Sequence, residues 1–252
     1  MMTESAVPQI KWRRWQEAQS HEQEFWSSSA ARIEQGTSGQ LDWYDWKAGQ
    51  LEACLAAAPH PLPRDGKILE IGSGPIGIVN SLTWGERFAI DPLEDFYRQN
   101  PSLIQLRKPG TTYINGPGEQ LPFPDRSLSL VVIDNVIDHT YAPALILREI
   151  ARTLDPAGYL YLAVNVHTAW GALLHEALAV LQIDKRHPYT FTSNSLRRML
   201  TGNGFTIVSE DVENYGKARS AYRRSPSLRA QIKGWTGLSE FQHAVLCGRT
   251  AR

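Results

Sequence analysis

Three glycines stand between an apolar segment and a second apolar segment that ends in an acid. Residues 67–71 are short and apolar, Gly72, Gly74 and Gly77 follow them, and Asp91 ends the next apolar stretch. The first segment is typical of a strand buried on both faces, and the glycines allow a tight turn that a ligand can approach closely. A carboxylate about twenty residues beyond such a turn can accept hydrogen bonds from the hydroxyls of a ribose. The pattern therefore predicts a nucleoside-binding turn.

The glycine spacing fits more than one class of nucleotide cofactor. Gly72-x-Gly74-x-x-Gly77 also matches the fingerprint of dinucleotide-binding domains, so an NAD-dependent oxidoreductase explains the glycines and Asp91. That alternative gives no role to Glu70, which lies two positions before the first glycine, or to residues 118–123. Further segments have to decide between the two classes.

Three further features extend the pattern. They are Glu70, the segment Gly-Glu-Gln-Leu-Pro-Phe-Pro-Asp at 118–125, and the segment Ser-Leu-Val-Val-Ile-Asp-Asn-Val-Ile-Asp-His at 129–139. With these features, residues 66–166 resemble the class I S-adenosylmethionine-dependent methyltransferases, in particular the small-molecule branch that includes quinone and sugar methyltransferases. The resemblance extends more weakly over residues 187–208.

The resemblance implies S-adenosyl-L-methionine as the cofactor and a set of residues that would hold it. These residues are Glu70, Gly72, Ser73, Gly74, Asp91, Pro92, Gly118, Glu119 and Asn135. In this family the segment that starts at Gly118 lies on the adenine side, and an Asp or Asn often stands where this chain has Pro117. We therefore expect the adenine to be bound by backbone amides around Gly118 and Glu119, or by Asn115.

Two histidines that follow predicted strands are candidate general bases. Methyl transfer to a neutral hydroxyl is helped by a group that removes the hydroxyl proton. His139 follows Asp138, and a carboxylate beside an imidazole can raise its basicity; alternatively, His139 only hydrogen-bonds the start of the next helix. His167 is the second candidate, because the carboxyl ends of parallel strands line the ligand crevice. No closely spaced pair of carboxylates accompanies them, so we expect no metal.

Strands and helices alternate after residue 66. We expect strands at 67–71, 87–91, 111–115, 128–134, 158–166, 204–210 and 242–249. Such alternation predicts a Rossmann-like α/β fold with a seven-stranded, mostly parallel sheet and helices on both faces. The family resemblance implies that the last strand is antiparallel. We divide the chain into an N-terminal helical cap, 1–58, and a methyltransferase core, 59–252, with substrate-side inserts at 182–196 and 212–240.

Three regions outside the common core are expected to set substrate choice. In 10–58, aromatic residues recur at helical spacing and form either a lid over the acceptor or ordinary helix packing; they are Trp12, Trp15, Phe25, Trp26, Trp43, Tyr44 and Trp46. In 182–196, Thr192 or Ser193 caps a helix. His187 and Tyr189 either reach the active site or belong to a loop fixed by Pro188.

The third region, 214–239, is basic. It holds Lys217, Arg219, Arg223, Arg224, Arg229 and Lys233 and no acidic residue. The cations either hold an anionic group of the acceptor or form a solvated basic face.

The overall composition agrees with a small-molecule enzyme. The chain has 26 basic and 26 acidic residues, so bulk attraction to nucleic acid or to an anionic membrane is not expected. Cys54 and Cys247 lie far apart, which favours a reducing compartment, and no apolar run is long enough to span a membrane. We predict a cytoplasmic methyltransferase that acts on a small acceptor, in the first instance on a hydroxyl oxygen of a sugar, glycan or phenolic natural product. A non-catalytic cofactor-binding protein of the same fold is a further alternative.

Overall fold

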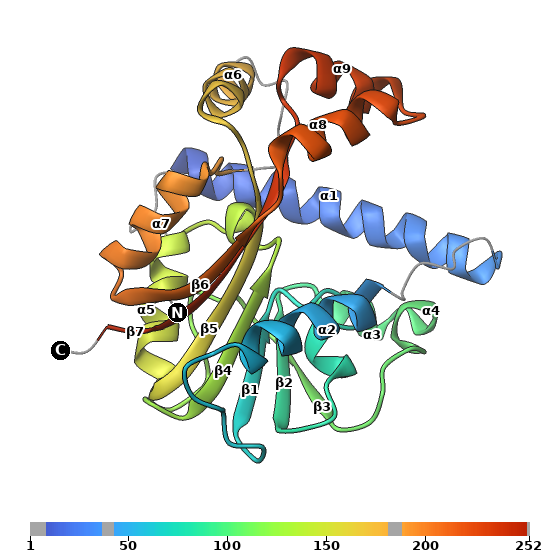
Figure 1. Cartoon of the computed structure of the whole chain (residues 1–252). Helices are drawn as coiled ribbons and strands as arrows, with labels where there is room; N and C mark the ends of the chain where they lie inside the picture. Colours follow the sequence, from blue (N-terminus) through green and yellow to red (C-terminus); the bar gives the residue numbers. More distant parts are fainter. Residues whose placement is uncertain (1–8, 37–42, 181–187, 251–252) are drawn as a thin grey trace.

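A seven-stranded sheet forms the centre of the molecule in this computed structural model (Figure 1), which describes residues 9–36, 43–180 and 188–250. The strands are β1 (Lys67–Ile71), β2 (Glu86–Asp91), β3 (Thr111–Asn115), β4 (Leu128–Asp134), β5 (Leu154–Val166), β6 (Phe205–Val212) and β7 (Phe241–Arg249). Their order is β3-β2-β1-β4-β5-β7-β6. β7 is antiparallel to both of its neighbours, and the other paired strands are parallel. The predicted fold class is confirmed.

The strand boundaries differ from the predicted ones by more than one residue at two places, and by one residue at the starts of β2, β6 and β7. β5 begins at Leu154, directly after a helix, because Leu154 already pairs with Leu128 before the register shifts. β6 continues to Val212, which pairs with His243 of β7. In both cases, pairing with a neighbouring strand extends the strand beyond the boundary that its own residues predict.

Helices surround the sheet. They are α1 (Gln9–Glu34), α2 (Trp43–Ala56), α3 (Glu94–Arg98), α4 (Pro101–Ile104), α5 (Pro143–Thr153), α6 (Ala169–Val180), α7 (Ser193–Gly202), α8 (Tyr215–Arg224) and α9 (Leu228–Thr236), with short 3-10 turns η2 (Ile78–Ser81) and η3 (Ile137–His139). None of the helices among the described residues is long and apolar enough to cross a bilayer.

The two faces of the sheet bury separate apolar clusters. Ile68, Leu130 and Tyr159 are paired neighbours on one face and pack with α2. Leu69, Val131 and Leu160 are their successors on the opposite face and pack with α5 and α7. Since side chains alternate along a strand, three continuous apolar segments supply both layers of the core.

The N-terminal helix α1 lies across the end of the sheet at which the parallel strands terminate (Figure 1). Its Trp26 and Ala30 form a third cluster with Tyr97 of α3 and Leu103 of α4. At the same end of the molecule, α6, α8 and α9 project beyond α1. The carboxyl ends of the strands are thus covered by elements outside the alternating core.

Candidate active site

A cavity of about 840 Å³ lies where β1, β2 and β4 end. Its floor is formed by the residues that follow these strands and its roof by α1. The residues that line it are Trp15, Ala18, Gln19, Glu22, Phe25, Trp26, Ser29, Arg32, Ile33, Trp43, Tyr44, Glu70, Ile71, Gly72, Ser73, Gly74, Ile78, Asp91, Pro92, Leu93, Pro117, Gly118, Glu119, Asp134, Asn135, Val136, His139, Thr140 and Ile146. The cavity thus brings together all nine predicted cofactor residues and one of the two predicted bases.

The glycine turn after β1 forms the centre of the floor. Gly72 has φ of +71°, and a Cβ there would lie 2.4 Å from the methyl carbons of Val136. Gly74 has φ of +59°, and its Cβ would meet Trp26 at 3.2 Å and the Tyr44 hydroxyl at 3.3 Å. Both positions require glycine, since an L side chain would be strained in this backbone region and would clash. The turn is thus packed between the end of β4 and the N-terminal helices.

Asp91 ties the glycine turn to the end of β2. The Gly74 N–H donates to Oδ2 of Asp91 at 2.9 Å, and the Leu93 N–H donates to Oδ1 at 2.8 Å. Burial raises the pKa of this carboxyl to about 6, although the two amide bonds act in the opposite direction. Each carboxylate oxygen has a second lone pair that can accept from a ligand hydroxyl. Asp91 therefore holds the turn in shape, and its carboxylate oxygens can still accept hydrogen bonds from a ligand in the cavity.

Glu70 is the second buried carboxylate of the floor. Its Oε2 accepts a hydrogen bond from the Val79 N–H at the start of η2, at 2.9 Å. Burial raises the pKa of Glu70 to about 8. Gly77 approaches so closely that an added Cβ would lie 2.7 Å from Oε2, so the third glycine of the motif makes room for this carboxylate.

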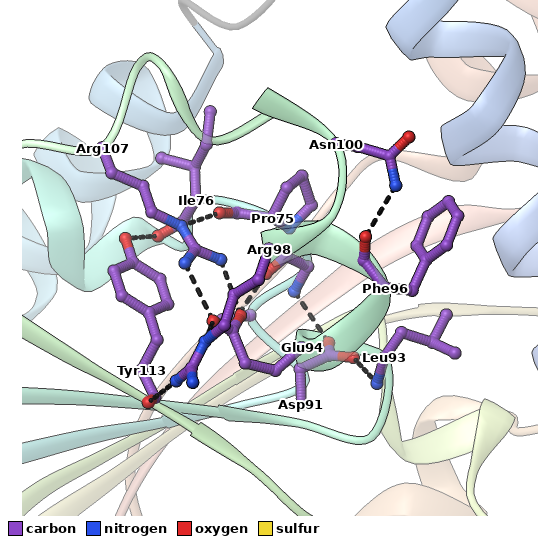
Figure 2. A network of polar contacts seen from close by, with 12 residues as sticks. Pro75, Ile76, Asp91, Leu93, Glu94, Phe96, Arg98, Asn100, Arg107 and Tyr113 are labelled. Carbon is purple, nitrogen blue, oxygen red and sulfur yellow. Dashed lines mark hydrogen bonds and ion pairs between the residues drawn. The ribbon is translucent and has the colours of Figure 1, made fainter. Parts of the chain in front are cut away.

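A network of charged groups supports the turn from outside the cavity (Figure 2). Glu94 is buried and accepts from both terminal nitrogens of Arg107, at 2.9 and 2.6 Å, and from Nε of Arg98 at 2.8 Å. Nε of Arg107 donates to the carbonyl of Pro75 at 2.6 Å, and its guanidinium stacks 3.5 Å from the ring centre of Tyr113. Arg107 therefore fixes the residues that follow Gly74 against the helix that follows Asp91.

Glu119 and Gly118 lie in the wall that the family resemblance assigns to adenine. Oε1 of Glu119 accepts from the N–H groups of Tyr141 and Ala142, just before α5, at 3.2 and 3.3 Å. Burial raises the pKa of Glu119 to about 7. A Cβ on Gly118 would lie 2.5 Å from Ile71, so this glycine allows the loop to pack on β1. Of the positions expected to bind adenine, Gly118 and Glu119 line the cavity and Asn115 does not.

Asp134 ends β4 and Asn135 follows it, and a lysine of α2 reaches Asp134. Nζ of Lys47 lies 2.7 Å from Oδ2 and 3.0 Å from Oδ1 of Asp134, with both side chains almost completely buried. Burial raises the pKa of Asp134, and the Lys47 ammonium opposes that rise. Asn135 has φ of +54°; its Nδ2 donates to Asp134 at 2.8 Å, and its Oδ1 accepts from the Asn165 N–H at 3.0 Å. Asn135 therefore braces the ends of β4 and β5 while it lines the cavity.

Aromatic side chains of α1 form the roof. Trp15 contacts the ring of Tyr141 edge-to-face at 5.4 Å, and Trp26 contacts Tyr97 at 6.1 Å. Nε1 of Trp26 donates to Glu22 at 2.8 Å. The side chain of Trp12 is outside the described residues. The roof therefore combines these rings with four polar or charged side chains of α1, which are Gln19, Glu22, Ser29 and Arg32.

The two candidate bases lie in different places. His139 ends η3, lines the large cavity, and has its Nε2 3.7 Å from a carboxylate oxygen of Asp138. His167 is buried and lines only a neighbouring cavity of about 50 Å³, beside His175 at a ring separation of 5.1 Å. His139 lines that small cavity as well. His139 is thus the histidine that connects the two spaces.

The substrate-side inserts contribute less to the cavity than expected. Thr192 caps α7 by accepting from the Ser195 N–H at 3.1 Å, so the cap is Thr192 rather than Ser193. The Tyr189 hydroxyl donates to the carbonyl of Tyr141 at 3.0 Å, and His187 lies outside the described residues. None of the six cations of 214–239, all of them described, lines the large cavity.

Two contributions to the site were not predicted from the sequence. One is the Lys47–Asp134 pair, and the other is the Glu94–Arg107 network. The burial of Lys47 could have been recognised from the sequence, because helical spacing places it on the same face of α2 as Tyr44, Ala48 and Leu51, which are buried. Arg107 had none, since it lies in an irregular segment between α4 and β3.

Comparison with known proteins identifies a domain of the chain. Residues 69–162 match the family model described as a methyltransferase domain. An uncharacterized methyltransferase of Schizosaccharomyces pombe is 25% identical over 120 residues, which are 43% of each chain. The chain thus matches less than half the length of that curated relative.

Solved structures share the fold at low sequence identity. A proposed methyltransferase from Bacillus halodurans C-125 has a TM-score of 0.59 at 17% identity, covering 81% of this chain and 99% of that one. Geranyl diphosphate C-methyltransferase from Streptomyces coelicolor A3(2) has a TM-score of 0.55 at 11% identity, covering 84% and 86%. The domain match identifies residues 69–162 as a methyltransferase domain, which agrees with the predicted resemblance, and the solved structures share the predicted fold.

Proposed function

We propose that this chain, which carries a class I S-adenosylmethionine-dependent methyltransferase domain, transfers the methyl group to a hydroxyl oxygen of a small-molecule acceptor. The observation that carries the proposal is the composition of the cavity at the carboxyl ends of β1, β2 and β4. Five carboxylates line it, and Arg32 is the one Lys or Arg among its described lining residues. The five are Glu22, Glu70, Asp91, Glu119 and Asp134.

The cavity fits the cofactor in its charge as well as in its position. S-adenosylmethionine carries a sulfonium, an ammonium and one carboxylate next to a neutral adenosine, so its net charge is positive. Burial raises the pKa values of Glu70, Asp91 and Glu119, because it disfavours their charged forms, and a cationic ligand would favour the charged forms. An NAD-type cofactor would instead bring a negative diphosphate toward this acidic wall. The chemistry of the lining thus favours a sulfonium cofactor over the nicotinamide alternative.

Each element of the floor then has a role in binding. Asp91 accepts the ribose hydroxyls, Gly72 and Gly74 let the ligand approach β1, and Glu70 and Asp134 face its cationic end. Pro92 and the backbone of Gly118 and Glu119 bound the adenosine part, while Ser73 holds the turn through a bond from its Oγ to the Gly74 carbonyl at 3.0 Å. When bound, S-adenosylmethionine supplies an electrophilic methyl group on sulfur.

His139 is the proposed general base. It stands in the wall shared by the large and the small cavity, and Asp138 lies beside its ring. An imidazole in this position takes the hydroxyl proton as the acceptor oxygen attacks, and the nearby carboxylate stabilises the imidazolium. Helices α1 and α2 keep water from the reacting atoms, because their aromatic residues cover the floor.

The roof also indicates the kind of acceptor. Trp15, Phe25, Trp26 and Trp43 offer ring faces and edges to a flat or partly apolar molecule, such as a phenolic natural product or a sugar. Arg32 lies in the same wall, where it donates to Ser29 and its guanidinium can also meet an anionic group of the acceptor. The geranyl diphosphate enzyme that shares this fold has a ligand with both apolar and anionic parts, which agrees with such a wall.

Cofactor binding is tested by calorimetric titration of S-adenosylhomocysteine into Asp91→Ala. We expect affinity to fall by about 1.5–3 kcal/mol, as for loss of a charged hydrogen bond. The matched control is Asp95→Ala, which removes an exposed carboxylate of α3 that does not line the cavity. If Asp91→Ala binds as tightly as the unchanged protein while remaining folded, Asp91 does not hold the ribose.

Methyl transfer is tested by incubating the protein with metabolite extracts and methyl-labelled S-adenosylmethionine, followed by mass spectrometry. A labelled product identifies the acceptor and the methylated atom. With that acceptor, His139→Gln should lower kcat about 10²–10⁴-fold without changing cofactor affinity. His21→Gln, which changes an exposed histidine of α1 outside the cavity, is the control. Tight cofactor binding without any labelled product would instead support a non-catalytic protein.

A further inference from the structure

The helix α9 carries an apolar face that no part of the described chain covers. Leu228, Ile232 and Trp235 lie at positions i, i+4 and i+7, on one side of the helix, and each side chain is more than half exposed. The contact of α9 with α8 is made on another side. There an added Cβ on Gly234 would lie 2.8 Å from the backbone nitrogen of Arg223. The three apolar residues therefore do not serve the core.

A second exposed pair continues this face. Trp170 and Leu173 lie three residues apart on α6, and both are more than half exposed. Nε1 of Trp170 donates to the carbonyl of Thr236 at 3.2 Å, which places it beside the carboxyl end of α9. We call Trp170, Leu173, Leu228, Ile232 and Trp235 the apolar ridge. Figure 1 shows α6, α8 and α9 projecting together from the same end of the molecule.

Six cations lie on α8 and α9, the second of which carries three residues of the apolar ridge. Residues 214–239 hold six basic and no acidic residues, and the rest of the chain holds 20 basic and 26 acidic residues. The net charge of the chain is therefore zero, although this segment is positive and the rest is negative. Arg219 and Arg223 donate to the Gly234 carbonyl, and Lys233 pairs with Glu240.

The remaining three cations of this segment face solvent. They are Lys217, Arg224 and Arg229. The guanidinium of Arg223 lies 4.5 Å from the ring centre of Trp235, so the cationic and apolar parts are contiguous.

We propose that the apolar ridge and its three exposed cations dock the protein on the surface of a membrane that contains anionic phospholipid. Tryptophan and aliphatic side chains next to Arg and Lys are the composition that binds the boundary between headgroups and acyl chains. A nucleic acid would neutralise the cations but leave Leu173, Leu228 and Ile232 in water. A symmetric contact with a second copy would oppose two surfaces of the same positive charge. An anionic bilayer satisfies both parts of the surface.

The experiment is vesicle flotation of the full chain, without acceptor, over phosphatidylcholine vesicles with and without 30% phosphatidylserine. Each exposed cation near an anionic surface contributes roughly fivefold, so we expect about a hundredfold preference for the anionic vesicles, weakened by salt. The double variant Leu228→Asn/Ile232→Asn should lose roughly tenfold or more in vesicle affinity. Arg224→Glu/Arg229→Glu should remove the preference for phosphatidylserine. The control is Leu106→Asn, an exposed apolar residue away from the ridge.

Three results would overturn the proposal. One is equal binding to both vesicle types, and the second is unchanged binding by Leu228→Asn/Ile232→Asn. The third is a concentration-dependent dimer, measured by light scattering without vesicles, that this double variant abolishes, because it would assign the ridge to a second copy. Vesicle binding requires no turnover, so its failure is separate from any failure of the proposed methyl transfer.

Discussion

The buried ion pair between Lys47 and Asp134 gives the sharpest test of how the N-terminal region supports the cavity. Lys47→Met removes the ammonium that contacts both oxygens of Asp134, at 2.7 and 3.0 Å. The side chains are only 7% and 4% exposed, so water cannot replace the lost cation without opening the packing of α2 on the sheet. The variant thus leaves a buried carboxylate without its partner charge.

The expected loss of stability follows from this burial. Breaking a buried pair by removing one partner costs about 3–5 kcal/mol. Nδ2 of Asn135 still donates to Asp134 at 2.8 Å, so we expect the lower end, about 3 kcal/mol. The double variant Lys47→Met/Asp134→Asn removes both charges and keeps similar shapes. Since replacement of a whole buried pair is often nearly neutral, it should lie within about 1.5 kcal/mol of the unchanged protein.

The loss should also depend on pH in a defined direction. Burial already raises the pKa of Asp134, and removal of Lys47 takes away the group that opposes this rise. Above the ordinary pKa of Asp, the unfolded variant has released a proton that the folded variant still binds. Its stability therefore falls as the pH rises, and the difference from the unchanged protein is larger at pH 8 than at pH 5.

The assay is urea unfolding of the single and double variants at pH 5 and pH 8. Lys67→Met is the matched control, because Lys67 forms an exposed pair with Glu86 at 3.7 Å and should cost less than about 1 kcal/mol. A loss below about 1 kcal/mol for Lys47→Met at pH 8 would refute the reasoning. So would a double variant as unstable as the single one, since the penalty would then not come from the unpaired Asp134.

Three further predictions concern the floor of the cavity. Arg107→Gln should cost about 3 kcal/mol in urea unfolding and Arg98→Gln less than about 1 kcal/mol, because both bind Glu94 but Arg107 is 13% and Arg98 55% exposed; equal losses would contradict this. Gly72→Ala should lower stability by about 2–5 kcal/mol through its positive φ and the contact with Val136, whereas Gly49→Ala, with open space in α2, should raise it by about 0.5–1 kcal/mol. Burial raises the pKa of Glu70 to about 8, so between pH 5 and 8 the folded unchanged protein retains a proton that its unfolded chain has lost, and its stability falls as the pH rises. Glu70→Gln lacks this proton, so its Tm should rise relative to that of the unchanged protein over the same range. A constant difference in Tm would show that Glu70 ionises normally.

The sheet could be predicted from the sequence because its signals are local. β1, β3 and β4 have the predicted bounds. β1 and β4 are largely apolar runs, and β3 is a short run of mainly β-branched and aromatic residues between Gly110 and Gly116. The place of the cavity followed from the same signals, because the carboxyl ends of parallel strands meet at one edge. Asp91 ends β2 and Asn135 follows β4, so their common location is a consequence of the topology.

The contacts of the site residues could not be predicted in this way. The sequence assigns Glu70 and Glu119 to a ligand, whereas the structure also engages their carboxylates with the backbone N–H groups of Val79 and of Tyr141 and Ala142. Lys47 and Asp134 are 87 residues apart, so neither position indicates the other. This pairing depends on how α2 packs on the sheet. The position of a helix on a sheet is not indicated by any spacing of residues in the sequence.

The arrangement implies that the N-terminal cap and the cofactor floor act as one unit. Trp26 of α1 and Tyr44 of α2 lie within about 3.3 Å of the position that a Cβ on Gly74 would occupy, and Lys47 of α2 neutralises Asp134 in the same wall. A shift of α2 would therefore expose the turn and unpair a buried carboxylate at the same time. Since ligand binding favours the state in which these contacts are made, bound cofactor should stabilise the cap, and changes in the cap should weaken cofactor binding by the same free energy. Under the proposed function, substrate choice by the roof would therefore be coupled to cofactor binding by the floor through Gly74 and Asp134.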